Sequence, residues 1–118
     1  MKTIRTTRIA GLMAMLVLAG CADPRIGPNS KPGWVTELYA PETLQANRPS
    51  CLAGLSAEQM AGHRYAEVSV SHGRSRTYVS ALVPASMTLH RHDKVEISPP
   101  SCKDGVVPEV VQILEHAP

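Results

Sequence analysis

The residue types best suited to chemistry in this chain are the sulfur and imidazole groups between Met87 and His92. If this stretch is a strand, His90 and His92 share one face of it, and imidazole together with a thioether suits monovalent copper. Two imidazoles and one thioether do not complete a metal site, and Arg91 and Lys94 would repel a cation. We therefore expect no resident metal, and keep a copper or zinc site of Met87, His90 and His92 as the weaker alternative.

Positively charged side chains are concentrated between His63 and Lys94. This stretch carries five Lys or Arg residues against two acidic residues, together with four of the five histidines. Arginine presents a planar fork that fits phosphates and carboxylates. An anionic-ligand site made of Arg74, Arg76 and Arg91 is therefore the preferred functional candidate, and a solvated face that binds nothing is the simpler alternative.

The sequence lacks the motifs of the common catalytic centres. It contains no Gly-x-Ser-x-Gly, no His-Glu-x-x-His, no phosphate-binding glycine loop and no carboxylate pair at a helical spacing within a predicted helix. Ser71 and His72 are neighbours in sequence, but neighbours in a strand point to opposite faces. We expect no catalytic residues, no cofactor and no enzymatic activity.

The first part of the chain has the layout of a secretory signal peptide. Lys2, Arg5 and Arg8 form a basic head, and residues 9–20 are uncharged and mostly apolar. As a helix this run would span about 18 Å at ~1.5 Å per residue. That is too short to cross the ~30 Å hydrocarbon core of a membrane.

The sequence Leu18-Ala19-Gly20-Cys21, which ends this segment, resembles the lipobox of bacterial lipoproteins. The resemblance implies that the Cys21 thiol receives a diacylglycerol thioether, that the signal peptide of residues 1–20 is removed, and that the new amino group is acylated. Two or more acyl chains hold a protein on a membrane. Because Ala22 and not aspartate follows the cysteine, the family's sorting habit implies the outer membrane, with the domain facing the periplasm or the cell surface. An ordinary cleaved signal peptide is the alternative.

Removal of the signal peptide changes the sign of the net charge. It takes away three of the 12 Lys and Arg residues and none of the 10 acidic residues, which leaves a net charge of about −1. The basic character of the whole chain therefore belongs mostly to the signal peptide, and no nucleic-acid partner is expected. The resemblance implies a membrane contact through Cys21, and as further partners peptidoglycan, lipopolysaccharide or an envelope protein. The expected function is non-catalytic support of envelope assembly, secretion or integrity.

The other two cysteines occur in matching contexts. Cys51 and Cys102 each lie in the pattern Pro-Ser-Cys-x-x-Gly, in which proline fixes φ and glycine frees it. We expect the two turns to meet at a disulfide, which an oxidising envelope compartment would permit. Closing a loop of this length stabilises a fold by up to ~4 kcal/mol. Two reduced buried thiols are the first alternative, and a metal site that uses both is the second.

The mature chain divides into a tether and one domain. Residues 21–33 contain many prolines and glycines and almost nothing apolar, which predicts a flexible tether. The domain over residues 34–118 begins with a β-prone stretch near Trp34. Ser56 and Gln59 have the form of a capping box, which predicts one short helix over about 57–62.

Alternation of apolar and polar residues predicts the strands of this domain. Four strands are expected, over about residues 64–71, 77–83, 93–98 and 109–115. The first two form a hairpin that places these residues on one face: Ala66, Val68, Val70, Val79, Ala81 and Val83. In the later strands Val95 and Ile97 point inward, and Val111 and Ile113 share a face opposite Val110 and Leu114.

These elements look like the short meanders of small barrels in envelope lipoproteins. The expected fold is mainly β: a small SH3-like or OB-like barrel or sandwich with one short helix, braced by the disulfide between Cys51 and Cys102. The glycine-zipper segment that some such lipoproteins carry is absent from this sequence. The mature domain is therefore not assigned to a specific family.

Overall fold

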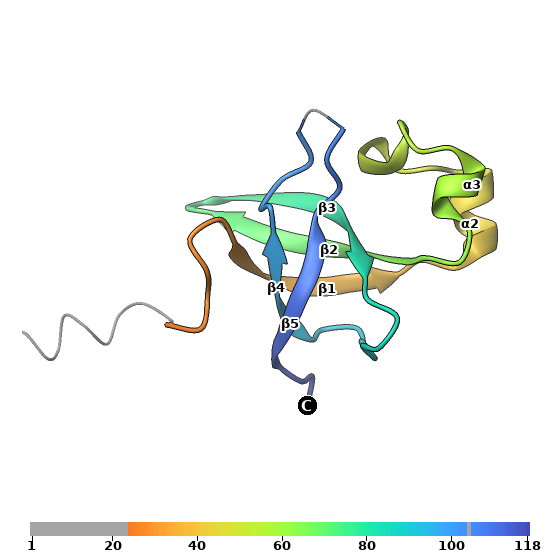
Figure 1. Cartoon of the computed structure of the whole chain (residues 1–118). Helices are drawn as coiled ribbons and strands as arrows, with labels where there is room; N and C mark the ends of the chain where they lie inside the picture. The colour runs from red at the N-terminus through yellow and green to blue at the C-terminus, as the bar shows by residue number, and fades with distance from the viewer. Residues whose placement is uncertain (1–23, 104) are drawn as a thin grey trace, which may run out of the picture.

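Five strands form a closed barrel in the order β1-β2-β3-β5-β4 (Figure 1). The computed structural model describes residues 24–103 and 105–118, so the predicted signal peptide and Cys21 lie outside the described residues. The strands are β1 (Lys31–Leu38), β2 (Arg64–His72), β3 (Ser75–Val83), β4 (Lys94–Ser98) and β5 (Glu109–Glu115). β4 returns to pair with β1, and β3 runs parallel to β5, whereas the other pairs are antiparallel. The predicted mainly β fold is confirmed, and the barrel has the five-stranded Greek-key order of the OB-like alternative.

The barrel core consists of aliphatic side chains from all five strands, in a chain that contains no phenylalanine. Val68 pairs with Val79 and Ala66 with Ala81 in the β2–β3 register, so the predicted apolar faces of the hairpin meet inside the barrel. The hairpin prediction is confirmed. The buried core residues are Val35, Ala66, Val68, Val70, Val79, Ala81, Val83, Leu89, Val95, Ile97 and Val110.

The barrel closes where β1 passes from β4 to β2. Gly33 pairs with Val95 in β4, and the next residue, Trp34, pairs with Ser69 in β2. A Cβ atom at Gly33 would lie 2.5 Å from Cγ1 of Val68 and 2.9 Å from the backbone oxygen of Ser69. Glycine in a strand commonly marks such a close backbone approach. The sheet can close here because residue 33 has no side chain.

A β-bulge changes the inward face of β5. The pairing with β4 skips Val111, because Val110 and Gln112 pair with consecutive residues of β4. Val110 is consequently buried in the core, Val111 is 51% exposed, and Ile113 packs against the core. The expectation that Val111 and Ile113 share a face is wrong, because the extra residue of the bulge interrupts the alternation.

The segment before β1 lies along the barrel. β1 begins at Lys31, within the tether expected over residues 21–33. The Nη1 atom of Arg25 donates to a carbonyl oxygen of β5 at 3.1 Å, and the backbone N–H of Gly27 donates to the carboxylate of Glu96 in β4 at 3.0 Å. The expected start of the domain at residue 34 is therefore corrected, because β1 begins at Lys31 and both Arg25 and Gly27 form hydrogen bonds with the barrel.

The connection from β1 to β2 carries the helices. They are α2 (Pro41–Ala46), the 3-10 helix η1 (Ser50–Leu52) and α3 (Ala57–Met60), so the connection holds more helix than the single one predicted. The capping box is confirmed: Gln59 N donates to Ser56 Oγ at 3.1 Å, and Ser56 N donates to Gln59 Oε1 at 2.8 Å.

A second apolar cluster lies beneath this connection, on the outside of the barrel. Leu44, Leu52 and Tyr65 are buried in it. Tyr65 precedes a core residue in β2, so its side chain points away from the barrel interior. The disulfide between Cys51 and Cys102 is confirmed, with an S–S distance of 1.99 Å and a Cα–Cα distance of 5.6 Å. It fastens the β1–β2 connection to the β4–β5 connection.

All five strands, both apolar clusters and the disulfide lie within residues 31–115. Every element named above therefore lies in the described part of the chain. No helix in this described part of the chain is long and apolar enough to cross a membrane.

Candidate functional site

Four side chains form a row across the outer surface of four strands. Lys94 in β4 pairs with Trp34 in β1, Trp34 pairs with Ser69 in β2, and Ser69 pairs with Tyr78 in β3. Each of the four is followed in sequence by a buried core residue, so all four side chains point outward. Because neighbouring strands lie ~4.8 Å apart, the two aromatic residues of the row are about 10 Å apart.

The aromatic rings of this row are accessible, and the serine between them is not. Trp34 is 37% exposed and Tyr78 is 59% exposed, whereas Ser69 is 1% exposed. The Nη1 atom of Arg76 donates to Ser69 Oγ at 3.2 Å, which holds the guanidinium over the gap between the rings. We call these residues, Trp34, Ser69, Arg76, Tyr78 and Lys94, the aromatic face.

Cations adjoin both rings of the aromatic face. The Nζ atom of Lys94 lies 5.5 Å from the centroid of the Trp34 ring, a distance at which a cation is attracted to the ring. Arg76 is two residues before Tyr78 in β3, so both project from the same side of the strand. The aromatic face can therefore offer ring surfaces and charged donors to one ligand.

More basic side chains lie where the β2–β3 hairpin turns. The Nζ atom of Lys31 is 3.0 Å from His72 Nδ1, and His72 Nε2 is 2.9 Å from Thr77 Oγ1. An ammonium group only donates, so Nδ1 of His72 accepts and its Nε2–H donates to the threonine. Arg74 occupies the exposed turn itself.

A cleft of about 560 Å³ adjoins the exposed ring of Tyr78. The disulfide forms part of its lining, because Cys51 and Cys102 both line it. Its volume falls within the ~300–1,000 Å³ of small-ligand sites. The cleft is lined by Ser50, Cys51, His72, Thr77, Tyr78, Val79, Ser101, Cys102 and Lys103.

Glu67, the acidic residue nearest to the row along β2, already has hydrogen-bond partners. Glu67 accepts from Thr36 Oγ1 at 2.8 Å and from the hydroxyl of Tyr39 at 3.4 Å. Burial raises the pKa of Tyr39, and a hydrogen bond with Ser80 opposes this rise. The Tyr39 hydroxyl therefore stays protonated and donates to the carboxylate of Glu67.

The three arginines of the predicted anionic-ligand site, Arg74, Arg76 and Arg91, come from two parts of the fold. Arg91 donates through Nε to the backbone oxygen of Thr36 at 3.1 Å, and the hydroxyl of Thr36 bonds to Glu67. The backbone of Arg76 pairs with Ser71, four residues beyond Glu67 in β2, and its guanidinium reaches back to Ser69. The structure therefore divides the basic stretch into the hairpin end, with Arg74 and Arg76, and the β3–β4 connection, with Arg91.

The sulfur and imidazole groups of residues 87–92 do not form a strand face. Residues 84–93 connect β3 to β4 without strand structure, and His92 has a φ of 75°. Met87 packs against the barrel core, whereas the side chain of His90 is 69% exposed. The expectation that His90 and His92 share a strand face is wrong, because Pro84 ends β3 and the chain turns. Within residues 24–103 and 105–118, no group of three or more His, Cys, Asp and Glu side chains could hold a metal ion.

Sequence reasoning missed Trp34, Tyr78, Lys94 and Lys103 as site residues. A usable signal was present for Tyr78, since it stands beside Val79, which alternation assigns to the core, whereas the burial of Val35 beside Trp34 was not predicted. Large rings at the outward positions of half-buried strands are candidates for contact surfaces. The lateral alignment of the row depends on strand register, which the sequence pattern did not supply.

No family model matches this chain, and no curated protein or solved structure shows significant similarity to it.

Proposed function

We propose that the protein is a non-catalytic, lipid-anchored lipoprotein of the outer membrane that binds an anionic glycan of the cell envelope through the aromatic face. The observation that carries the proposal is the row of Lys94, Trp34, Ser69 and Tyr78 across four strands, with Arg76 between the rings. The lipobox resemblance at Cys21 supports the location. Binding of this kind would support envelope assembly or integrity without a chemical step.

The ligand class follows from the chemistry of the aromatic face. The flat C–H surface of a sugar ring is apolar and can lie on the exposed rings of Trp34 and Tyr78, and the corresponding surface of OB-like barrels suits oligosaccharides. Phosphate or carboxylate groups would accept from Arg76 and Lys94. Peptidoglycan and lipopolysaccharide both combine sugar rings with such groups, so both are tested.

The copper- or zinc-handling alternative is not favoured by an observation. Met87 is turned toward the barrel core, and Arg91 lies between the two histidines in sequence.

The decisive experiment compares two charge reversals. The protein is sedimented with purified sacculi and with lipopolysaccharide vesicles, and Arg76→Glu is compared with Arg91→Glu, which makes the same change in net charge on the β3–β4 connection, beside Thr36 and outside the aromatic face. We expect Arg76→Glu to weaken binding at least tenfold, because a charge-assisted hydrogen bond contributes ~1.5–3 kcal/mol, and Arg91→Glu to change it little. Equal losses in both variants would mean that only overall charge matters, and the proposed site would be wrong.

Ring removal and salt provide the second part of this experiment. The double change Trp34→Ala with Tyr78→Ala should also abolish sedimentation with the glycan, and binding should weaken between 0.1 M and 1 M salt as the Debye length falls from ~10 Å to ~3 Å. Retention by sacculi but not by lipopolysaccharide vesicles, or the reverse, identifies the glycan. Binding by neither material would contradict the proposal.

The membrane anchor is tested separately. We expect Cys21→Ser to release the protein from the membrane fraction and to abolish labelling with radioactive palmitate. The barrel should remain folded, because its five strands lie between Lys31 and Glu115 and none of them includes Cys21. Wild-type protein that takes up no palmitate would end the lipoprotein interpretation.

A further inference from the structure

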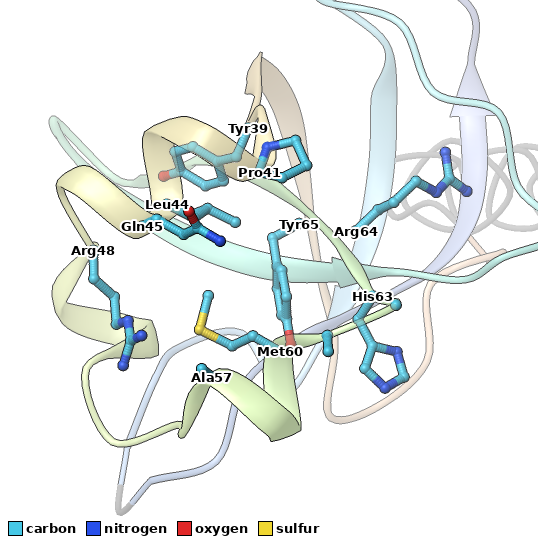
Figure 2. A pocket seen from close by; sticks show the side chains of 12 residues that line it. Tyr39, Pro41, Leu44, Gln45, Arg48, Ala57, Met60, His63, Arg64 and Tyr65 are labelled. Carbon is cyan, nitrogen blue, oxygen red and sulfur yellow. The ribbon is translucent and has the colours of Figure 1, made fainter.

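A cavity of about 530 Å³ opens between α2, α3 and the beginning of β2. Figure 2 shows Leu44 and Pro41 from the α2 side, Met60 from the α3 side, and the ring of Tyr65 standing between the two helices. The lining is mostly apolar, and its volume falls within the ~300–1,000 Å³ of small-ligand sites. It lies outside the aromatic face and shares no residue with it.

Tyr65 brings an unpaired polar group to this cavity. The residue is 4% exposed, and no other described residue forms a hydrogen bond with its hydroxyl. The described residues include no fully buried side-chain nitrogen or oxygen atom without a partner, so this hydroxyl must reach open space, which the cavity provides. Tyr39, which also lines the cavity, differs because its hydroxyl is paired with Glu67 and Ser80.

Basic side chains line the cavity, and acidic ones among the described residues do not. Arg48, His63 and Arg64 line it, and no aspartate or glutamate does. Arg64 is committed elsewhere, because its Nη2 atom donates to the backbone oxygens of Pro84 and Met87. Figure 2 accordingly shows its guanidinium directed away from the helices, whereas Arg48 and His63 stand on opposite sides of the cavity. Arg48 uses one nitrogen for Leu55 O and keeps further N–H donors.

We propose that this cavity binds a fatty acid. The acyl chain would lie against Pro41, Leu44 and Met60, and the carboxylate would accept a hydrogen bond from the Tyr65 hydroxyl. Burial raises the pKa of Tyr65, so the hydroxyl remains a donor. The positive potential of Arg48 at the mouth favours a carboxylate and disfavours a cationic head group. The inference does not depend on the glycan-binding proposal.

Calorimetric titration of the Cys21→Ser protein with decanoate, dodecanoate and tetradecanoate below their micelle concentrations tests the apolar contact. Each added CH₂ group should tighten binding by up to about fourfold, from the free energy of burying one CH₂ group. Dodecyltrimethylammonium has the same chain as dodecanoate with a cationic head, and it should bind at least tenfold more weakly. Equal binding of the two probes, or affinity that is independent of chain length, would overturn the proposal.

Two matched tyrosine variants test the carboxylate contact. Tyr65→Phe removes only the hydroxyl in the cavity and should weaken dodecanoate binding about tenfold, while Tyr78→Phe makes the same chemical change outside the cavity and should leave binding unchanged. Ala57→Trp, at an exposed residue of the lining, should fill the cavity and abolish binding while the thermal unfolding of the barrel is retained. Dodecanoate binding that survives Tyr65→Phe and Ala57→Trp would place the ligand elsewhere and refute the assignment.

Discussion

The inside of the barrel and the cluster beneath the β1–β2 connection are both apolar, but they are held together in different ways. Eleven buried residues form the barrel core, and strand register places them opposite one another. The outer cluster has three buried residues, Leu44, Leu52 and Tyr65, surrounded by partly buried ones. The second region therefore depends more on the disulfide at Cys51 and on short-range caps, because it buries too little surface to order its own chain.

This difference separates the two candidate binding regions. The aromatic face is carried by strands whose inner residues are fixed in the core, so its side chains are spaced by the sheet. The fatty-acid cavity lies between two short helices that pack loosely enough to leave about 530 Å³ between them. The barrel can present a rigid row of charges and rings, whereas the connection can enclose an apolar chain.

The largest expected effect comes from a side chain at the point where the barrel closes. Gly33→Val should remove the folded state, at a cost above about 5 kcal/mol, because its Cβ would collide with Val68 and with the backbone of Ser69. Gly54→Val, in the connection, is the matched control, since nothing lies within 4 Å of a Cβ built there. Urea unfolding followed by circular dichroism measures both variants. A folded Gly33→Val protein would show that the barrel can open at this corner.

Removal of the disulfide should loosen the connection and leave the barrel paired. Replacing Cys51 and Cys102 with alanine should cost up to ~4 kcal/mol in the chain-entropy description, for a sequence separation of 51 residues. Hydrogen exchange should accelerate mainly in α2 and α3, and less in the β2–β3 hairpin. If exchange accelerates equally in both regions, the barrel and the connection form one cooperative unit and the proposed contrast fails.

Acidification should destabilise the barrel where β4 begins and should have less effect on the β1–β2 connection. Asp93 is buried where β4 begins, and its carboxylate accepts from the backbone N–H groups of His90 at 2.8 Å and Ala117 at 2.7 Å. Burial raises the pKa of Asp93, but these two hydrogen bonds and the imidazoles of His116 and His90 outweigh it and hold the pKa below its ordinary value of 3.8.

A carboxyl group whose pKa is lowered in the folded state stabilises that state above its ordinary pKa, and this contribution is lost as the pH falls through the folded-state pKa. Stability should therefore decline as the pH falls below about 4. Asp93→Asn should reduce stability at pH 7 by about 2 kcal/mol, the scale of a hydrogen bond to a charged group, and should flatten the decline in acid. Urea midpoints between pH 3 and 7 measure this effect. An unchanged acid profile in the variant would assign the decline to other carboxylates.

Local patterns predicted the β2–β3 hairpin and the capping box at Ser56 because both depend on residues close in sequence. The same reasoning failed for β5, where the bulge at Val111 is set by pairing with β4, and for the segment before Lys31, whose partners lie about 70 to 90 residues away along the chain. The basic stretch was recognised as a candidate site, and its grouping of Arg91 with Arg74 and Arg76 stays a prediction, since Arg91 lies on the β3–β4 connection and the other two lie at the hairpin end.

The sequence by itself determined the mainly β class, the inward faces of the hairpin and the pairing of Cys51 with Cys102. Period-two alternation, turn residues and cysteine contexts are properties of short segments, so they can be read without knowing where a segment lies in the fold. Only the tertiary structure decided that Lys94, Trp34, Ser69 and Tyr78 form one row and that Tyr65 lies in a cavity with its hydroxyl unpaired. Those arrangements depend on barrel closure and on how the β1–β2 connection packs against the outside of the barrel. Both are determined by contacts between residues that are distant in sequence.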